Sequence, residues 1–420
     1  MPATRTPIAI ASGCNLAANL AFPVLAIRAL GAGHDADALF IVFILPAVVT
    51  VLLGNSVLNW AAPRMVRRDS DASRCEFAWG LLWVLLACVA LLCLLLWLAG
   101  LWLAPRLDPH GSYALALAVL PAGFVAVMAA VAMAVCQSLY TAERAVLGAE
   151  LRTLLANTLA LLAWLVVAPS TLAGCVLLFV LRQSLQAAVL LPRLGRPRAP
   201  VAGDRDLREV LRDSRALLLA ATYYKSEPFV DRLLFASVSA GAVAAFQLAH
   251  QVIGTVTQMM NRVVTATLVA PLAERVHAGD GAGARRTLQR ALALMLAVGL
   301  AAWLLFLLAG EALLQTLFAG ANPDSAHIAL TAQMLVLLGG YMLAILLGQV
   351  LGQAFYTTGD TRTVMWLGII GYTLGLGIKL LALRWYGAPG LAAALSLSWL
   401  LNLSFYRFVQ PPLFRPPVRS

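Results

Sequence analysis

The run from Phe77 to Ala104 constrains the fold most, because it holds no charged residue and is long enough to cross a bilayer. A transmembrane helix needs about 20 predominantly apolar residues. The strands of a membrane barrel would instead alternate apolar and polar residues over segments of about ten. The whole chain is 61% hydrophobic and 12% charged, whereas about a quarter of a soluble domain is charged. The sequence therefore predicts an all-α polytopic membrane protein and excludes a β-barrel and a water-soluble enzyme.

Apolar runs and the residues that interrupt them predict twelve transmembrane helices joined by short loops. Their expected ranges are Thr6–Leu30, Ala36–Ala61, Phe77–Ala104, Tyr113–Tyr140, Leu151–Pro169, Leu172–Leu191, Ala216–Ser237, Ala242–Ala273, Leu288–Ala309, Ile328–Tyr356, Val364–Leu383 and Leu391–Phe408. Between the sixth and seventh spans, the segment Asp204–Arg215 has its apolar residues on one helical face, which is typical of a helix lying at the membrane surface.

Arginines are concentrated in the loops that follow the second, sixth and eighth predicted helices. These arginines are Arg64, Arg67, Arg68, Arg74, Arg193, Arg196, Arg198, Arg205, Arg208, Arg212, Arg275, Arg285 and Arg286. Positively charged residues near span ends stay in the cytoplasm, so both termini are predicted to be cytoplasmic. The same loops account for much of the net charge of +11, and no nucleic-acid partner is predicted.

Two landmarks repeat in the two halves of the chain. Gly33 precedes Pro63 by the same interval that separates Gly241 from Pro271, and the sequence QSLYT at 137–141 returns as QAFYT at 353–357. Six helices per half would place both halves in the membrane with the same orientation, related by a pseudo-two-fold axis along the membrane normal. The expected divisions are a lobe at 1–192, a cytoplasmic linker with an amphipathic helix at 193–214, a lobe at 215–408 and a cytoplasmic tail at 409–420.

The seventh predicted helix carries four charges, which is unusual at bilayer depth. Lys225, Glu227, Asp231 and Arg232 all fall within it, together with Pro228, which is expected to kink the helix. An ionisable residue inside the membrane is costly and therefore a candidate for function. Mutual neutralisation of the two acids and two bases, with Arg232 reaching the outer interface, remains the alternative.

Further ionisable residues fall within or beside other predicted spans. The candidates for substrate binding are Arg28, Asp37, Arg182, Lys225 and Arg262, and those for coupling or gating are Glu227, Asp231, Arg232 and Lys379. A lone lysine at this depth needs an acidic partner, so we hypothesise that Lys379 pairs with Asp231. The six cysteines show no metal-binding spacing, so neither a metal nor a cofactor is predicted.

Nine short motifs are spread over nearly the whole chain. They are Leu30-Gly31-Ala32-Gly33, Asp37-Ala38-Leu39-Phe40, Leu45-Pro46, Val230-Asp231-Arg232-Leu233-Leu234, Ala236-Ser237, Ala278-Gly279-Asp280, Arg286-Thr287-Leu288, Ala354-Phe355-Tyr356 and Gly359-Asp360-Thr361-Arg362-Thr363. In this order and spacing the chain resembles the MurJ/MviN-type lipid II flippases of the multidrug/oligosaccharidyl-lipid/polysaccharide (MOP) exporter superfamily. The resemblance implies two six-helix lobes around a central cavity. It also implies an alternating-access transporter and not an enzyme. Such a transporter would flip a polyprenyl-pyrophosphate-linked saccharide across the bacterial inner membrane for cell-wall or polysaccharide biosynthesis.

The chain departs from that family at its usual cationic positions. Leu16 and Phe22 stand where the family carries arginines in its first helix, Thr50 replaces the arginine of the second, and Ala249-His250-Gln251-Val252 replaces Ala-Asp-Arg-Leu in the eighth. Asp37 is kept. The chain ends after twelve predicted helices, where members usually carry two more. Arginines or lysines at other positions would then have to supply the positive charge, namely Arg28, Arg182, Arg262 or Lys225.

The coupling ion stays open between proton and sodium. Some members bind sodium between an acid of the seventh helix, which Asp231 would match, and polar residues of the eleventh helix, where this chain has Lys379. Besides the membrane lipids and the lipid-linked substrate, no further partner is predicted.

Three other functions remain open from the sequence. One is an ion-coupled exporter of small amphipathic cations, and another is a degenerate, non-transporting partner of a synthesis complex. The third is a membrane glycosyltransferase, because Asp35-Ala36-Asp37 matches the acidic pair that such enzymes use. Aspartates are also common at helix N-termini, which is the interpretation we favour for this pair.

Overall fold

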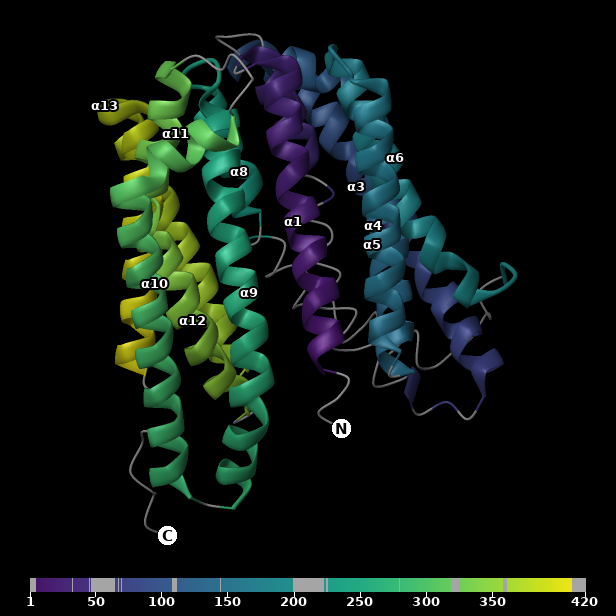
Figure 1. Cartoon of the computed structure of the whole chain (residues 1–420), viewed down its shortest axis with the longest axis vertical. Coiled ribbons are helices and arrows are strands. Elements are labelled where there is room, and N and C mark those ends of the chain that lie inside the picture. Colours follow the sequence, from purple (N-terminus) through teal and green to yellow (C-terminus); the bar gives the residue numbers. More distant parts are fainter. Residues whose placement is uncertain are drawn as a thin grey trace. The chain divides into compact units, whose positions relative to one another are not determined.

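The computed structural model is all-helical over the residues that it describes (Figure 1). These are residues 5–31, 33–44, 46, 65–66, 68, 70–107, 112–143, 145–198, 223, 226–278, 280–318, 325–357 and 361–409. The chain divides into two compact units, Met1–Ala244 and Ala245–Ser420.

The first unit is a bundle of long apolar helices. Its elements are α1 (Arg5–Leu30), an unlabelled helical segment at 34–44, α3 (Asp71–Leu107), α4 (Ser112–Ala142), α5 (Val146–Val167), α6 (Leu172–Leu190), a short 3-10 helix η1 (Leu191–Leu194) and α8 (Glu227–Ala236). Helix α4 packs against α3 and α6, while α5 packs against α1 and α6. Polar residues of α1, α5 and α6 are therefore brought together inside this unit.

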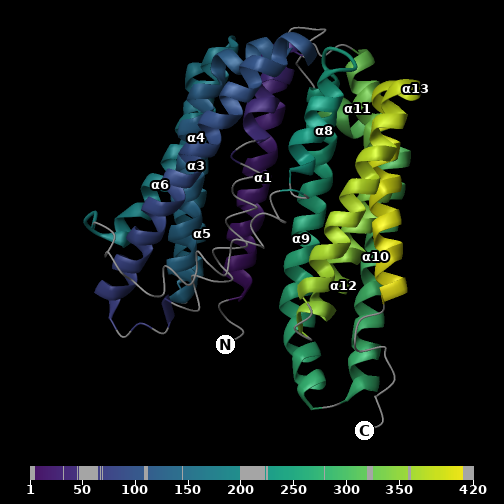
Figure 2. The same cartoon turned by 180° about the vertical axis from the view of Figure 1, so that it is seen from behind.

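The second unit holds the remaining helices. They are α9 (Ala242–His277), whose first turn lies in the first unit, α10 (Gly281–Leu317), α11 (Ser325–Leu337), α12 (Gly339–Thr357) and α13 (Thr361–Val409). Helix α12 packs against α10 and α13, which run beside it in both views (Figures 1 and 2).

Eight helical stretches among the described residues are long and apolar enough to cross a membrane. Of the twelve predicted spans, the second and the seventh are described only in part, and the last two are merged in α13. Gly387 interrupts α13 with a non-helical backbone at a φ of 59°, and Pro389 follows it. This interruption lies at the boundary predicted between the eleventh and twelfth spans.

The tenth predicted span, Ile328–Tyr356, was expected as one helix, and the structure breaks it into α11 and α12 at Leu338. Ser396 of α13 causes the break, because its hydroxyl donates to the Leu337 carbonyl at 2.5 Å and accepts from the Tyr341 N–H at 3.0 Å. These two backbone groups would bond each other in an unbroken helix. The insertion of a side chain between them opens the helix without leaving either group unsatisfied.

Glycines make room for the side chains that surround this break. A Cβ atom on Gly339 would overlap the ring of Trp303, whose Nε1–H donates to the Val336 carbonyl at 2.9 Å. A Cβ on Gly340 would lie 3.0 Å from the Cβ of Ser396. The two adjacent glycines therefore allow α10 and α13 to approach the α11–α12 junction closely.

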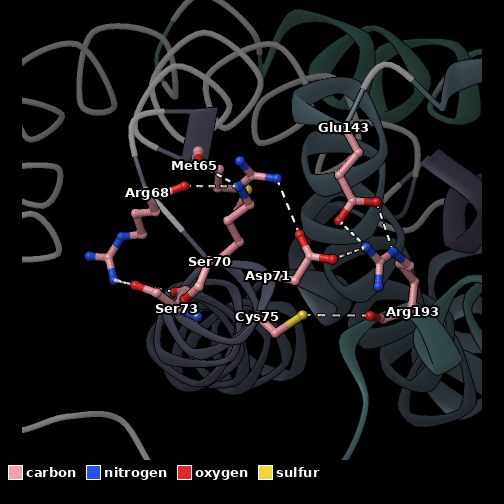
Figure 3. Close-up of polar contacts among 9 residues, drawn as sticks. Met65, Arg68, Ser70, Asp71, Ser73, Cys75, Glu143 and Arg193 are labelled. Atoms are coloured by element: carbon pink, nitrogen blue, oxygen red, sulfur yellow. Dashed lines mark hydrogen bonds and ion pairs between the residues drawn. The ribbon is translucent and has the colours of Figure 1, made fainter.

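An ion-pair cluster joins the ends of several helices on the predicted cytoplasmic side of the first unit (Figure 3). The Arg193 guanidinium donates to both carboxylate oxygens of Glu143, at 2.6 and 2.7 Å, and to Asp71 at 3.3 Å. Asp71 also pairs with Arg74 at 3.3 Å, and Arg74 donates to the Met65 carbonyl at 3.2 Å. Because Glu143 ends α4 and Arg193 lies in η1 after α6, the cluster connects α3, α4 and α6.

Candidate functional site

A buried arginine lies where α1, α5 and α6 meet. Arg182 is 7% exposed, and its Nε donates to the Asn157 side-chain oxygen at 2.9 Å. Its Nη2 donates to the side-chain oxygen of Asn19. The guanidinium carbon lies 4.1 Å from the centre of the Phe22 ring, a cation–π geometry. The cation of α6 is thus held by neutral groups from α1 and α5.

No carboxylate among the described residues forms an ion pair with Arg182. The residue is the eleventh of nineteen in α6, so its Cα lies about 15 Å along the helix from the start of α6 and about 12 Å from its end. A charge at that depth is costly unless it is used or compensated. This geometry is that of a fixed cation held by neutral partners.

The position of Phe22 bears on the missing arginines. Phe22 is one of the two apolar residues that stand where the flippases carry arginines in their first helix. The structure places the guanidinium of Arg182 over that phenyl ring, and the ring in turn meets Trp164 edge-on at 5.7 Å. Positive charge is therefore present beside this point of α1, although it comes from α6.

Asp37 was expected near the outer interface and as a helix N-cap, and the structure buries it completely. One carboxylate oxygen accepts from the Gly241 N–H at 2.7 Å, and the other accepts from the Ala244 N–H at 2.8 Å. The carboxylate therefore caps the N-terminus of α9 and not that of its own helix. Asp35 is exposed, so the two aspartates do not share an environment.

Helix α8 begins at Glu227, and Pro228 lies in its first turn, where a proline does not disrupt helical hydrogen bonding. Residues 216–222 and 224–225 of the predicted seventh span lie outside the described residues, so the expected kink stays a prediction. Asp231 is 4% exposed and Arg232 is 2% exposed, and Arg232 donates to the Pro228 carbonyl at 2.7 Å. Arg232 is thus buried within the first unit, and its proposed contact with the outer interface stays a prediction.

The other predicted site residues are placed less completely. Arg28 is exposed in the last turn of α1, while Lys379 is 2% exposed within α13. Lys225 lies outside the described residues, as does the side chain of Arg262, whose backbone belongs to α9. The pairing of Lys379 with Asp231 and the assigned roles of all these residues stay predictions.

Sequence reasoning missed the polar residues that surround Arg182. These are Asn19 and Asn157, which bond the guanidinium, and Asn15 and Glu150, which continue the hydrogen bonds from Asn157. A signal was present, because polar residues spaced four or seven apart share one face of a helix. Such pairs are Asn15 and Asn19 in α1, Glu150 and Asn157 in α5, and Arg182 and Gln186 in α6, all within mainly apolar helices. Among the described side chains, no group of His, Cys, Asp and Glu is arranged to hold a metal ion.

The fold and the site together define the class of protein. Two units of long apolar helices, with an arginine and a lysine buried inside helices apolar enough to cross a membrane, characterise a polytopic membrane transporter. A sequence model described as lipid II flippase MurJ matches residues 27–412. The chain therefore belongs to the lipid II flippase MurJ family, whose members are inner-membrane transporters.

Solved structures agree with this assignment at the level of the fold. The lipid II flippase MurJ in an inward closed conformation has a TM-score of 0.82 at 12% identity, covering 96% of this chain and 87% of that chain. An inward-facing multidrug resistance MATE family transporter of the MOP superfamily has a TM-score of 0.69 at 14% identity, covering 92% of each chain. A MOP superfamily transporter from Pyrococcus furiosus has a TM-score of 0.64 at 13% identity, covering 98% of this chain and 96% of that chain. A search of the curated proteins by sequence found no match.

Proposed function

We propose that the protein is an alternating-access flippase that moves a polyprenyl-pyrophosphate-linked saccharide across the bacterial inner membrane for cell-wall or polysaccharide biosynthesis. The observation that carries the proposal is the buried cation Arg182, which forms no ion pair with a carboxylate of the described residues. Membership of a family named for a lipid II flippase supplies the substrate class.

The chemistry of Arg182 suits a pyrophosphate. A guanidinium carries five N–H donors in a planar fork that matches phosphate oxygens. Two of these donors bond Asn157 and Asn19, and the others are available to an anion. The amide oxygens hold the guanidinium in place without cancelling its charge, so the site is preorganised for an anion before it arrives.

The proposal includes an arrangement of the chain in the membrane. Both termini are cytoplasmic, and the two lobes are the predicted halves at 1–192 and 215–408. Transport follows when the substrate and a coupling ion, proton or sodium, stabilise the inward-open and outward-open states to different degrees. Glu227, Asp231, Arg232 and Lys379 are the proposed coupling residues, with Arg28, Lys225 and Arg262 as further contacts for the anionic head group.

The buried charge of the first unit argues against an exporter of small amphipathic cations. A cationic substrate would be repelled by Arg182, whereas an anionic head group would be attracted. The burial of Asp37 likewise argues against a glycosyltransferase, since both oxygens of its carboxylate are bonded to the start of α9.

A flipping assay in proteoliposomes tests the proposal. The purified protein is reconstituted with a fluorescent polyprenyl-pyrophosphate saccharide, and an external quencher reports how much probe changes leaflet. We expect protein-dependent movement that is lost in Arg182→Ala and in Asp231→Asn and retained in Arg196→Ala, which changes an exposed arginine of the cytoplasmic segment after η1. If folded wild-type protein moves no probe, the proposal is wrong, and the cation exporter or the non-transporting partner takes its place.

A further inference from the structure

A chain of three hydrogen bonds connects Arg182 to an acid near the cytoplasmic end of α5. Arg182 Nε donates to the Asn157 oxygen at 2.9 Å, and Asn157 Nδ2 donates to the Asn15 oxygen at 2.9 Å. Asn15 Nδ2 then donates to Glu150 Oε2 at 2.8 Å. The guanidinium and the carboxylate are thus joined through two amide side chains, one from α5 and one from α1.

The direction of this chain is fixed by its ends. A guanidinium can only donate hydrogen bonds, and an ionised carboxylate can only accept them. Asn157 therefore turns its oxygen toward Arg182, where it also accepts from Gln186 at 2.7 Å, and turns its nitrogen toward Asn15. Each amide dipole points the same way, with its negative end toward the cation and its positive end toward the carboxylate.

We propose that Glu150 is the counter-charge that sets how tightly Arg182 holds the anionic head group of the substrate, an inference that rests on the proposed function. The carboxylate does not touch Arg182 and acts through Asn15 and Asn157, so Glu150 is a positioning and tuning residue and not a substrate ligand.

Aligned hydrogen bonds in a low-dielectric interior polarise one another, so the carboxylate lowers the electrostatic potential that Arg182 presents to an anion. Asn15 and Asn157 are buried, at 6% and 1% exposure, which limits screening by water along the chain. A flippase must release its substrate as well as bind it, and an uncompensated buried cation would hold a pyrophosphate too long. The counter-charge keeps binding weak enough for turnover.

The test is Glu150→Gln, because glutamine keeps an oxygen that can accept from Asn15 and removes only the charge. Binding of a short-chain polyprenyl pyrophosphate and of the uncharged polyprenol is measured in detergent, and flipping is measured in proteoliposomes. We expect about tenfold tighter binding of the pyrophosphate, the scale of one unit charge acting over roughly 12 Å at an effective dielectric constant of about 20. The affinity for polyprenol should not change, and the rate of flipping at saturating probe should fall. Glu150→Asp keeps the negative charge and should behave like wild type.

A matched background separates this effect from a structural one. In Arg182→Gln protein, Glu150→Gln should leave pyrophosphate affinity unchanged, since the cation that holds the head group within range of the Glu150 charge is gone. The inference would be overturned if Glu150→Gln alone left pyrophosphate affinity unchanged. It would also be overturned if Glu150→Gln raised polyprenol affinity by the same factor, or raised pyrophosphate affinity equally in the Arg182→Gln background. If wild-type protein binds pyrophosphate no better than polyprenol, the proposed function itself fails, and the two failures are therefore distinguishable.

Discussion

The carboxylate of Asp37 gives the sharpest stability prediction, because one buried side chain completes the start of a long helix. The first N–H groups of a helix have no partner within it. Asp37 supplies acceptors to Gly241 and Ala244 from more than 200 residues away in sequence. Replacing it by alanine leaves two N–H donors without their acceptors and removes a negative charge from the positive end of α9.

The magnitude follows from these contacts. A buried donor that loses its partner costs about 1–3 kcal/mol, so two donors cost roughly 2–6 kcal/mol before the surroundings relax. Relaxation and entering water reduce this cost, and we expect Asp37→Ala to lower the free energy of unfolding by about 3 kcal/mol. For a unit of this size, that loss corresponds to a decrease in Tm of about 6–12 °C.

Thermal unfolding of the detergent-solubilised protein, followed by tryptophan fluorescence, measures this loss. The control is Asp35→Ala, two residues earlier in the same segment, whose side chain is exposed and makes no hydrogen bond to a described residue. It should melt within about 1 °C of wild type, since exposed substitutions usually change stability by less than about 0.5 kcal/mol. Equal Tm values for the two variants would refute the capping role.

Two further comparisons test packing at the helix break and at the cytoplasmic cluster. Gly339→Ala should lower the free energy of unfolding by about 1–3 kcal/mol, because its new methyl group overlaps a tryptophan ring. Gly348→Ala in the same helix is the control, since its new methyl group meets nothing within 4 Å and should not destabilise the protein. Equal melting temperatures for the two variants would contradict this packing. Arg193→Ala should cost about 1–2 kcal/mol, because it leaves the 10% exposed side chain of Glu143 without its bidentate partner. High salt should narrow that difference, and Arg196→Ala should melt like wild type; a matching loss in this variant would count against the ion pair.

Much of the helical fold could be predicted, because a bilayer demands long apolar segments and the punctuation between them is local. The break at Leu338 could not be predicted in the same way. It depends on a hydroxyl that arrives from Ser396, 55 residues beyond the Tyr341 N–H that it accepts from. The adjacent glycines Gly339 and Gly340 were the available signal, although glycine is common in membrane helices and does not by itself predict a break.

The candidate site was predictable in its charges and not in its contacts. Arg182 was identified because a mid-span arginine is costly. Its partners could not be predicted, because Asn157 lies 25 residues before it and Asn19 lies 163 residues before it, on two different helices. Asp37 was favoured as a helix cap, and the structure shows that it caps a helix from the other half of the sequence. Periodicity within one helix indicates which residues share a face, whereas the neighbour of that face depends on tertiary packing.

The central claim is that a buried arginine of α6 recognises the anionic head group. The most direct measurement compares the affinities of wild-type and Arg182→Gln protein for polyprenyl pyrophosphate and for polyprenol in the same detergent. We expect the variant to lose at least about tenfold in pyrophosphate affinity, since a hydrogen bond to a charged group contributes about 1.5–3 kcal/mol. Its affinity for polyprenol should not change. Equal pyrophosphate affinity in a folded variant would contradict the account.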